Sequence, residues 1–261
     1  MGRLKGPVVA SVARGMSLFP TRALRAMETA AALGQGKGWG AGTSAHEVAA
    51  ALSLLPPNAR RHVVAVDAGA NIGNWTAEFL KQCPLGRVVA FEPSEFASSK
   101  FRARFANDER VVLVQQGLGR APGEATLWSD VPGSPLGTLE RPKLDRPGAT
   151  FGTAETVNVT TLDAWSDGTD LRCGLLKMDV EGWELEVLAG ASRLLRGIKV
   201  IQFEFGPANL HSRTFFQDYW RLLSSDGFGI LRLTPSGLAS VDSYSEVHES
   251  FRTTNFFAVR R

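Results

Sequence analysis

Short apolar runs alternate with amphipathic stretches along the chain from residue 62 onward. The apolar runs have the length and the β-branched content of buried strands, and the stretches between them have helical spacing. Strands that alternate with helices in this way predict βαβ units and a parallel sheet. The expected strands cover residues 62–67, 87–92, 111–116, 174–179 and 199–205, and the expected helices cover residues 73–82, 95–106, 183–195 and 213–226.

Two segments depart from this alternation. Residues 117–165 contain two expected strands, GEATLW and ETVNVTTLDAW, around a Pro/Gly-rich segment at 131–152. That segment is too long for a simple connector, so we expect a loop or lid. Near the C-terminus, FGILRLT and TTNFFAV read as two strands with no helix between them, which predicts an antiparallel addition to the sheet edge.

The first 60 residues have a different character. TRALRAMETAAALG predicts a helix at 21–34, and a second helix at 45–55 begins near Ser44 and Glu47, which have capping-box spacing. We therefore predict an N-terminal helical extension, residues 1–60, followed by one α/β domain, residues 61–261. The amphipathic first helix could pack on a second copy, so a homodimer is left open.

Composition narrows the functional classes. The chain has 261 residues, 44% of them hydrophobic, and a formal net charge of +3 without a run of like charges, which argues against a nucleic-acid partner. No apolar stretch reaches about 18 residues, so no membrane span is predicted. Cys83 and Cys173 lack metal-ligand spacing and suit a reducing interior. We therefore expect a cytoplasmic protein.

The stretch VDAGANIGNWT, residues 66–76, contains a strand end, a glycine turn and a helix start. A dinucleotide turn needs the pattern G-x-G-x-x-G, but Asn71 and Asn74 occupy the second and third glycine places. Asp67 also precedes the turn, and its carboxylate would repel a pyrophosphate. These features disfavour a nicotinamide cofactor.

S-adenosylmethionine fits the turn better, because it carries a sulfonium, an ammonium and one carboxylate. Asp67 suits the cationic groups, and the helix N-terminus after Gly73 offers N–H groups to the carboxylate. Glu92 ends the next strand and can accept hydrogen bonds from ribose hydroxyls. The residues expected to bind this cofactor are Asp67, Gly69, Asn71, Gly73, Asn74, Glu92, Gln116, Leu118 and Asp179.

Four stretches together carry a family resemblance: VDAGANIGNWT, VVAFEPS, VNVTTLDAW with LLKMDVEGWELEVLAGA, and IQFEFG with the terminal TNFFAV. With these motifs, residues 62–260 resemble FkbM-family methyltransferases, a class I S-adenosylmethionine-dependent group. The resemblance implies a Rossmann-like fold, with a mostly parallel seven-stranded sheet, an antiparallel last strand and helices on both faces. It also implies O-methylation of a hydroxyl on a sugar, glycan or natural product. Trp183 departs from the family pattern, which often has a small residue there.

Carboxylates gather at the predicted strand ends. Asp179 and Glu181 follow the fourth strand, and Glu204 ends the neighbouring fifth. Such a group could take the proton of an acceptor hydroxyl, and mutual repulsion would raise the pKa of at least one member. Lys177 shares a strand face with Asp179 and is expected to orient the acceptor or neutralise the acids. His211 is a second candidate for the general base.

Other interpretations stay open at this stage. Glu181 could simply cap the following helix. The carboxylate oxygens could hold a divalent cation, although no metal site is predicted. An N- or carboxyl-methyltransferase, a nicotinamide-dependent oxidoreductase and a non-catalytic cofactor-binding protein are alternatives. The expected partner is a small-molecule or glycan acceptor whose identity the residues do not reveal.

Overall fold

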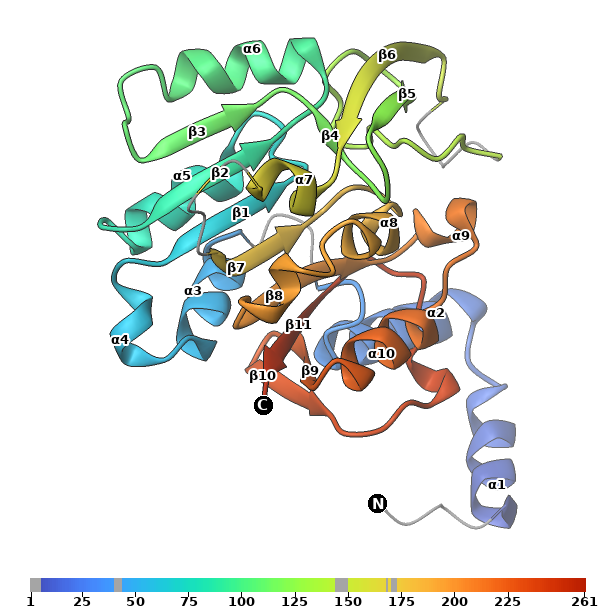
Figure 1. Cartoon of the computed structure of the whole chain (residues 1–261). Helices are drawn as coiled ribbons and strands as arrows, with labels where there is room; N and C mark the ends of the chain where they lie inside the picture. The colour runs from blue at the N-terminus through green and yellow to red at the C-terminus, as the bar shows by residue number, and fades with distance from the viewer. Residues whose placement is uncertain (1–5, 40–43, 144–149, 168, 170–172) are drawn as a thin grey trace.

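A twisted sheet runs through the centre of the computed structural model, which describes residues 6–39, 44–143, 150–167, 169 and 173–261 (Figure 1). Within that part of the chain the sheet has eight strands in the order β10-β9-β11-β8-β7-β1-β2-β3. They are β1 (Val64–Ala68), β2 (Arg87–Phe91), β3 (Val111–Val114), β7 (Cys173–Met178), β8 (Val200–Phe205), β9 (Phe228–Thr234), β10 (Gly237–Val241) and β11 (Thr254–Arg260). The α/β fold with a mostly parallel central sheet is confirmed.

Helices cover both faces of this sheet (Figure 1). Side chains alternate along each strand, so the central parallel strands are apolar on both faces and fill two cores. One core packs against α3 (Ser44–Leu54), α5 (Asn74–Gln82) and α6 (Glu95–Arg104), and the other against α7 (Leu162–Ser166), α8 (Glu184–Ala189) and α10 (Phe216–Ser225). The strands β3, β2, β1, β7 and β8 run parallel, so their carboxyl ends meet at one edge.

The C-terminal strands build the far end of the sheet. β11 lies between β8 and β9 and runs antiparallel to both, as the family resemblance implies for the last strand. The sheet has one strand more than the expected seven, because the turn after β9 returns the chain as β10. Gly237, with φ 117°, is the residue that permits this return.

A smaller sheet stands beside the carboxyl edge, in the order β4-β6-β5. Its strands are β4 (Gly117–Leu118), β5 (Gly123–Ser129) and β6 (Thr153–Thr160). The two expected strands of this region are therefore present, but the end of the second motif forms α7, whose N-cap Thr161 accepts a hydrogen bond from the Ala164 N–H. Part of the predicted loop or lid, residues 144–149, lies outside the described residues.

Two expected helices are shorter than predicted. The helix predicted at 183–195 ends as α8, and a 3₁₀ turn, η1 (Leu194–Arg196), follows it. A Cβ on Gly190 would lie 2.0 Å from the Gly119 carbonyl oxygen, so the chain bends where two backbones meet. The helix predicted at 213–226 begins later, as α10, and a separate short helix, α9 (Asn209–Ser212), ends before it at Arg213, whose φ is 56°.

The N-terminal segment forms α1 (Gly6–Met16), α2 (Thr21–Gly34), α3 and α4 (Pro57–Arg60). α3 packs on the sheet, and its buried Glu47 accepts a hydrogen bond from Gln202 Nε2 of β8 at 2.8 Å. The division of the chain at residue 60 stays a prediction. Among the described residues, no helix combines the length and the apolar character that crossing a membrane requires.

Candidate active site

A pocket opens at the carboxyl edge of the sheet, between the glycine turn after β1 and the smaller sheet. Its wall consists of the turn, the ends of β2 and β7, β4 with the preceding Gln116, and β5 with the segment that follows it. The lining residues are Gly69, Asn71, Phe91, Glu92, Pro93, Ser94, Gln116, Gly117, Leu118, Leu127, Ser129, Gly133, Ser134, Pro135, Gly137, Leu139, Asp179, Val180 and Trp183. Six of the nine expected cofactor residues belong to this lining.

The glycine turn lies against the end of β7. Gly69 has φ 73°, and a Cβ there would lie 2.0 Å from the carbonyl oxygen of Asp179. Asn71 also has a left-handed conformation, with φ 46°. Only glycine fits the close approach at residue 69, which leaves the backbone of the turn exposed to the pocket.

Glu92 holds this turn in place. Its carboxylate is buried and accepts hydrogen bonds from the backbone N–H groups of Asn71 at 2.8 Å and Ser94 at 2.9 Å. Burial raises the pKa of Glu92 to about 7, although these two hydrogen bonds act in the opposite direction. A carboxylate with such a pKa is poised to change charge near neutral pH.

Trp183 lines the same pocket as Glu92, together with Gln116 and the buried Leu118. The indole Nε1–H of Trp183 is buried and has no hydrogen-bond partner among the described residues. A buried, unpaired donor in a pocket wall is unfavourable unless a bound ligand accepts from it. Sequence reasoning did not assign Trp183 to the cofactor, because the indole follows the acidic residues and gives no signal of its own.

The segment after β5 covers the pocket. The Asn71 side chain donates from Nδ2 to the Gly133 carbonyl oxygen at 3.1 Å. Thr138 Oγ1 donates to the Glu181 carbonyl oxygen at 2.9 Å. The segment is therefore bound both to the glycine turn and to the loop after β7.

Three of the expected cofactor residues do not line the pocket. Asp67 is fully buried, where it accepts from Thr76 Oγ1 at 2.7 Å and forms an ion pair with Lys177 at 2.9 Å. Gly73 is the N-cap of α5, and Asn74 accepts from Arg104 outside the pocket. These three residues lie behind the glycine turn, away from the pocket, and support its conformation.

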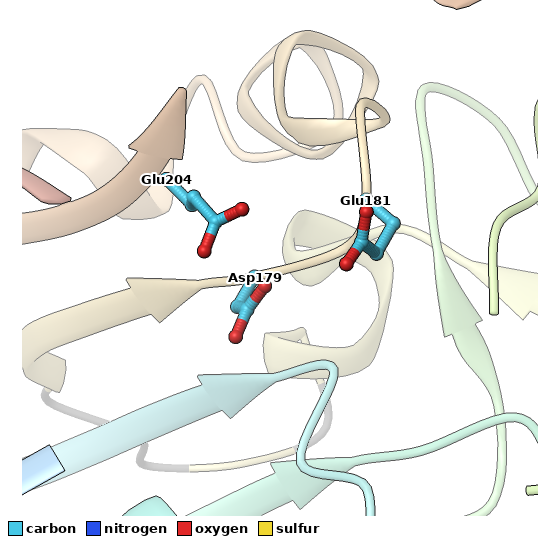
Figure 2. A group of neighbouring side chains, drawn as sticks. All are labelled: Asp179, Glu181 and Glu204. Atoms are coloured by element: carbon cyan, nitrogen blue, oxygen red, sulfur yellow. The ribbon is translucent and has the colours of Figure 1, made fainter. Parts of the chain in front are cut away.

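The acidic residues do come together, as Figure 2 shows. Asp179, at the end of β7, and Glu204, on β8, direct their carboxylates toward the same space, and Glu181 reaches it from the loop after β7 (Figure 2). One oxygen of each residue lies within 4.8 Å of the others, a spacing that a hard divalent cation could bridge. Burial, and then repulsion from Asp179 and Glu181, raises the pKa of Glu204 well above its usual range.

The remaining candidates occupy different places. Lys177 is buried, donates to the Gly69 carbonyl oxygen at 3.0 Å and lies 3.8 Å from the Asp179 carboxylate. Burial alone would lower the pKa of Lys177, but Asp67 and Asp179 raise it above its ordinary value. The side chain therefore neutralises acids behind the pocket. His211 is buried in α9, where its ring contacts Phe151 at 6.4 Å between centroids.

The residues of this pocket fit an adenosyl cofactor. Glu92 supplies a buried acceptor, Trp183 supplies a buried donor without a partner, and Gly69 keeps side-chain atoms out of the turn. An acceptor and a donor in one pocket match ribose hydroxyls and a heteroaromatic base.

Comparison with known proteins agrees with these features. A family model, the methyltransferase FkbM domain, matches residues 67–230. The chain is 30% identical to Methyltransferase sdnD of Sordaria araneosa over 198 residues, which cover 64% of this chain and 74% of that protein. It is 27% identical to 2-O-methyltransferase NoeI of Sinorhizobium fredii over 163 residues, covering 57% and 65% of the two chains. Among solved structures, it is similar to an rRNA methylase from Streptococcus thermophilus, with 13% identity, a TM-score of 0.45, and coverage of 82% and 93%. The family match spans most of the sheet and the pocket, and the chain therefore belongs to the FkbM family of methyltransferases.

Proposed function

We propose that this enzyme transfers the methyl group of S-adenosylmethionine to a hydroxyl oxygen of a sugar, glycan or natural product. The proposal rests on one observation: two sites adjoin at the same edge of the sheet. One is the pocket around Glu92, and the other is the group of carboxylates of Asp179, Glu181 and Glu204. Asp179 belongs to both. The name 2-O-methyltransferase, given to one relative, supports an oxygen acceptor.

The pocket residues have distinct roles in this proposal. Glu92 accepts hydrogen bonds from the ribose hydroxyls, and Trp183 donates its free N–H to the adenine. Gln116 and Leu118 flank the base, and the turn at Gly69 lies beside the methionine part. When bound, S-adenosylmethionine supplies an electrophilic methyl group on a sulfonium.

The carboxylates handle the proton of the acceptor. Glu204 is the preferred general base, because its raised pKa makes its ionised form more basic than an ordinary glutamate. The acceptor hydroxyl would lose its proton to this group as its oxygen forms a bond to the methyl carbon and the methyl–sulfur bond breaks, which would leave S-adenosylhomocysteine. Asp179 and Glu181 orient the hydroxyl, and His211 is the alternative base. Positioning the oxygen in line with the methyl–sulfur bond accounts for much of the rate.

The first test is calorimetric titration of the purified chain with S-adenosylmethionine and, separately, with NADH. Binding of the methyl donor alone supports the proposal, whereas binding of NADH alone would favour an oxidoreductase. A panel of hydroxyl, amine and carboxyl acceptors, screened for S-adenosylhomocysteine, then separates O-, N- and carboxyl-methylation. A cofactor-binding protein without catalysis would bind the donor but form no product with any acceptor.

The second test is the variant Glu204→Gln, with the exposed Glu109→Gln as the matched control. We expect Glu204→Gln to reduce turnover by about 100-fold or more, since general-base catalysis typically contributes 10²–10⁴-fold. The Kd for S-adenosylmethionine should stay within about twofold. Unchanged turnover in Glu204→Gln would move the base role to Asp179 or His211.

A further inference from the structure

Three cationic side chains outside the proposed catalytic site lie close together near the carboxyl edge of the sheet. Lys37 lies between α2 and α3, Arg232 on β9, and Arg252 just before β11. All three are partly buried. Burial, and then the charges of Arg232 and Arg252, lowers the pKa of Lys37, which shows that the three charges act on one another.

Close backbone contacts hold Lys37 in this position. A Cβ on Gly36 would lie 2.2 Å from the Leu233 carbonyl oxygen of β9. A Cβ on Gly38 would lie 3.7 Å from the Arg252 Cβ. The backbone on both sides of Lys37 therefore packs against β9 and the residues that lead into β11.

Two members of the group, Lys37 and Arg232, lack anionic partners among the described residues. Arg232 Nε is buried and has no hydrogen-bond partner among the described residues. Within the same part of the chain, neither the Lys37 nor the Arg232 side chain forms a hydrogen bond or an ion pair. A buried guanidinium nitrogen without an acceptor destabilises the fold, so an anionic ligand would be stabilising there.

Nearby carboxylates do not neutralise the group. Glu28 pairs with Arg252 at 3.1 Å, but its side chain is 71% exposed, and such a pair contributes little. Glu249 accepts hydrogen bonds from the backbone N–H groups of Phe216 and Gln217 at the start of α10. Burial, followed by the charges of Arg232 and Lys37, also lowers the pKa of the neighbouring His248. The local field therefore remains positive.

Strand register separates this group from the catalytic carboxylates. Arg232 of β9 is aligned with Phe256 of β11, and Phe256 is aligned with Phe203 of β8, so Arg232 shares the sheet face that packs against α10. Glu204 follows Phe203 and therefore faces the opposite side of the sheet. The cationic group is thus a site of its own, distinct from the acidic group.

We propose that Lys37, Arg232 and Arg252 bind a doubly charged oxyanion, either free phosphate or sulfate or an ester of one of them. Three neighbouring cations match a dianion better than a single carboxylate, and arginine offers a fork of N–H donors to such a group. The oxyanion site stands on the local geometry alone and is independent of the proposed methyl transfer.

The oxyanion site is tested with the full chain in the absence of S-adenosylmethionine. Calorimetry with inorganic phosphate, inorganic sulfate and acetate is run at constant ionic strength on the wild type, Arg232→Gln and Lys37→Gln. Arg61→Gln is the matched control, because Arg61 is exposed and precedes β1 at the opposite edge of the sheet. We expect phosphate and sulfate, but not acetate, to bind the wild type, with at least tenfold loss in both cluster variants and less than twofold loss in the control.

Circular dichroism and the Kd for S-adenosylmethionine verify that each variant is folded, and Lys37→Gln, in a loop, serves if Arg232→Gln misfolds. Absence of phosphate and sulfate binding by the wild type would overturn the oxyanion site. Equal binding by the wild type and the folded cluster variants would overturn it as well.

The source of the oxyanion is tested next, with glucose 6-phosphate, glucose and inorganic phosphate as probes. We expect uncharged glucose to bind at least tenfold more weakly than the ester. An ester that binds more tightly than inorganic phosphate identifies an esterified ligand, and an ester that binds no better identifies the free anion. Glucose that binds as tightly as its phosphate ester would overturn the oxyanion site. These titrations need neither donor nor turnover, so their failure is distinguishable from failure of the proposed methyl transfer.

Discussion

Replacing Glu92 with glutamine should weaken cofactor binding and remove its pH dependence. Glu92 is buried, and burial raises its pKa to about 7 from the ordinary 4.5. At 1.36 kcal/mol per pKa unit, this rise means that ionising Glu92 costs about 3 kcal/mol more in the folded protein than in water. Ribose hydroxyls would donate to the carboxylate, so binding the cofactor favours the charged form.

The expected affinities follow from this linkage. At pH 8 nearly all Glu92 is ionised, whereas at pH 6 only about one molecule in ten is, which weakens wild-type binding about tenfold. Hydrogen bonds to a charged acceptor contribute about 1.5–3 kcal/mol, so Glu92→Gln should weaken binding at pH 8 by roughly 10- to 150-fold. In the wild type, the backbone N–H groups of Asn71 and Ser94 each donate to one oxygen of Glu92. The side-chain NH₂ of the glutamine would replace one of these oxygens and face an N–H donor instead.

The assay is calorimetric titration with S-adenosylmethionine between pH 6 and pH 8.5 at constant ionic strength. Glu109→Gln, an exposed carboxylate elsewhere, is the matched control and should follow the wild type. Stability should change in the opposite direction from affinity. Because the folded pKa of Glu92 is raised, its contribution to stability is complete below about pH 4.5 and is lost as the pH rises through about 7. Wild-type affinity that is independent of pH, or a glutamine variant that binds like the wild type, would refute this account of Glu92.

Four further predictions concern the neighbouring residues. Gly69→Ala should lower the free energy of unfolding by about 2 kcal/mol or more in urea titrations. The alanine would have to adopt a left-handed backbone conformation, and its Cβ would lie 2.0 Å from the Asp179 carbonyl oxygen. An unchanged urea midpoint would contradict this close approach. Trp183→Phe should weaken S-adenosylmethionine binding about 5- to 10-fold and leave thermal stability unchanged or higher, since it removes a buried donor without a partner; a lower melting temperature with intact binding would indicate a structural role. Burial raises the pKa of Glu184 to about 7, so its stability contribution is also lost as the pH rises from about 4.5 through 7; the free energy of unfolding of Glu184→Gln should fall less between pH 5 and pH 8 than that of the wild type. Titration of the wild type with Mn²⁺ should release no binding heat, because the Lys177 ammonium, 3.8 Å from the Asp179 carboxylate, already offsets negative charge in the acidic group; heat that Glu204→Gln abolishes would instead assign the carboxylates to a metal ion.

Much of the fold follows from patterns that are local in the sequence. The strands at 62–67, 87–92 and 199–205 were predicted from short apolar runs, because strands buried on both faces carry that signal. The eighth strand was not predicted, because β10 lies at the sheet edge and alternates weakly. The interruption at Gly190 was missed as well, since it depends on contact with Gly119, far away in the chain.

The site was predicted less completely than the fold. Glu92, Asp179 and Glu204 could be recognised because each ends a strand of a parallel sheet, where ligands bind. Trp183 could not, because an unpaired indole donor becomes visible only when the surrounding atoms are placed. The cationic group was missed for a similar reason. Its members come from three separate segments, and no spacing in the sequence joins them.

Strand register explains why Asp67 and Lys177 looked like site residues and yet lie behind the pocket. Asp67, Lys177 and Gln202 are aligned across β1, β7 and β8 and form one polar row inside the fold. Each is followed two residues later by a residue on the same side of the sheet: Gly69, Asp179 and Glu204 form the next row, at the edge. The two rows are separated by about 7 Å along the strands. In the inner row the ion pair between Lys177 and Asp67 satisfies the charges internally, whereas in the outer row Glu204 has acidic neighbours and a raised pKa. Period-two spacing thus identifies the correct side of the sheet for both rows, and depth from the edge determines which row can meet a ligand.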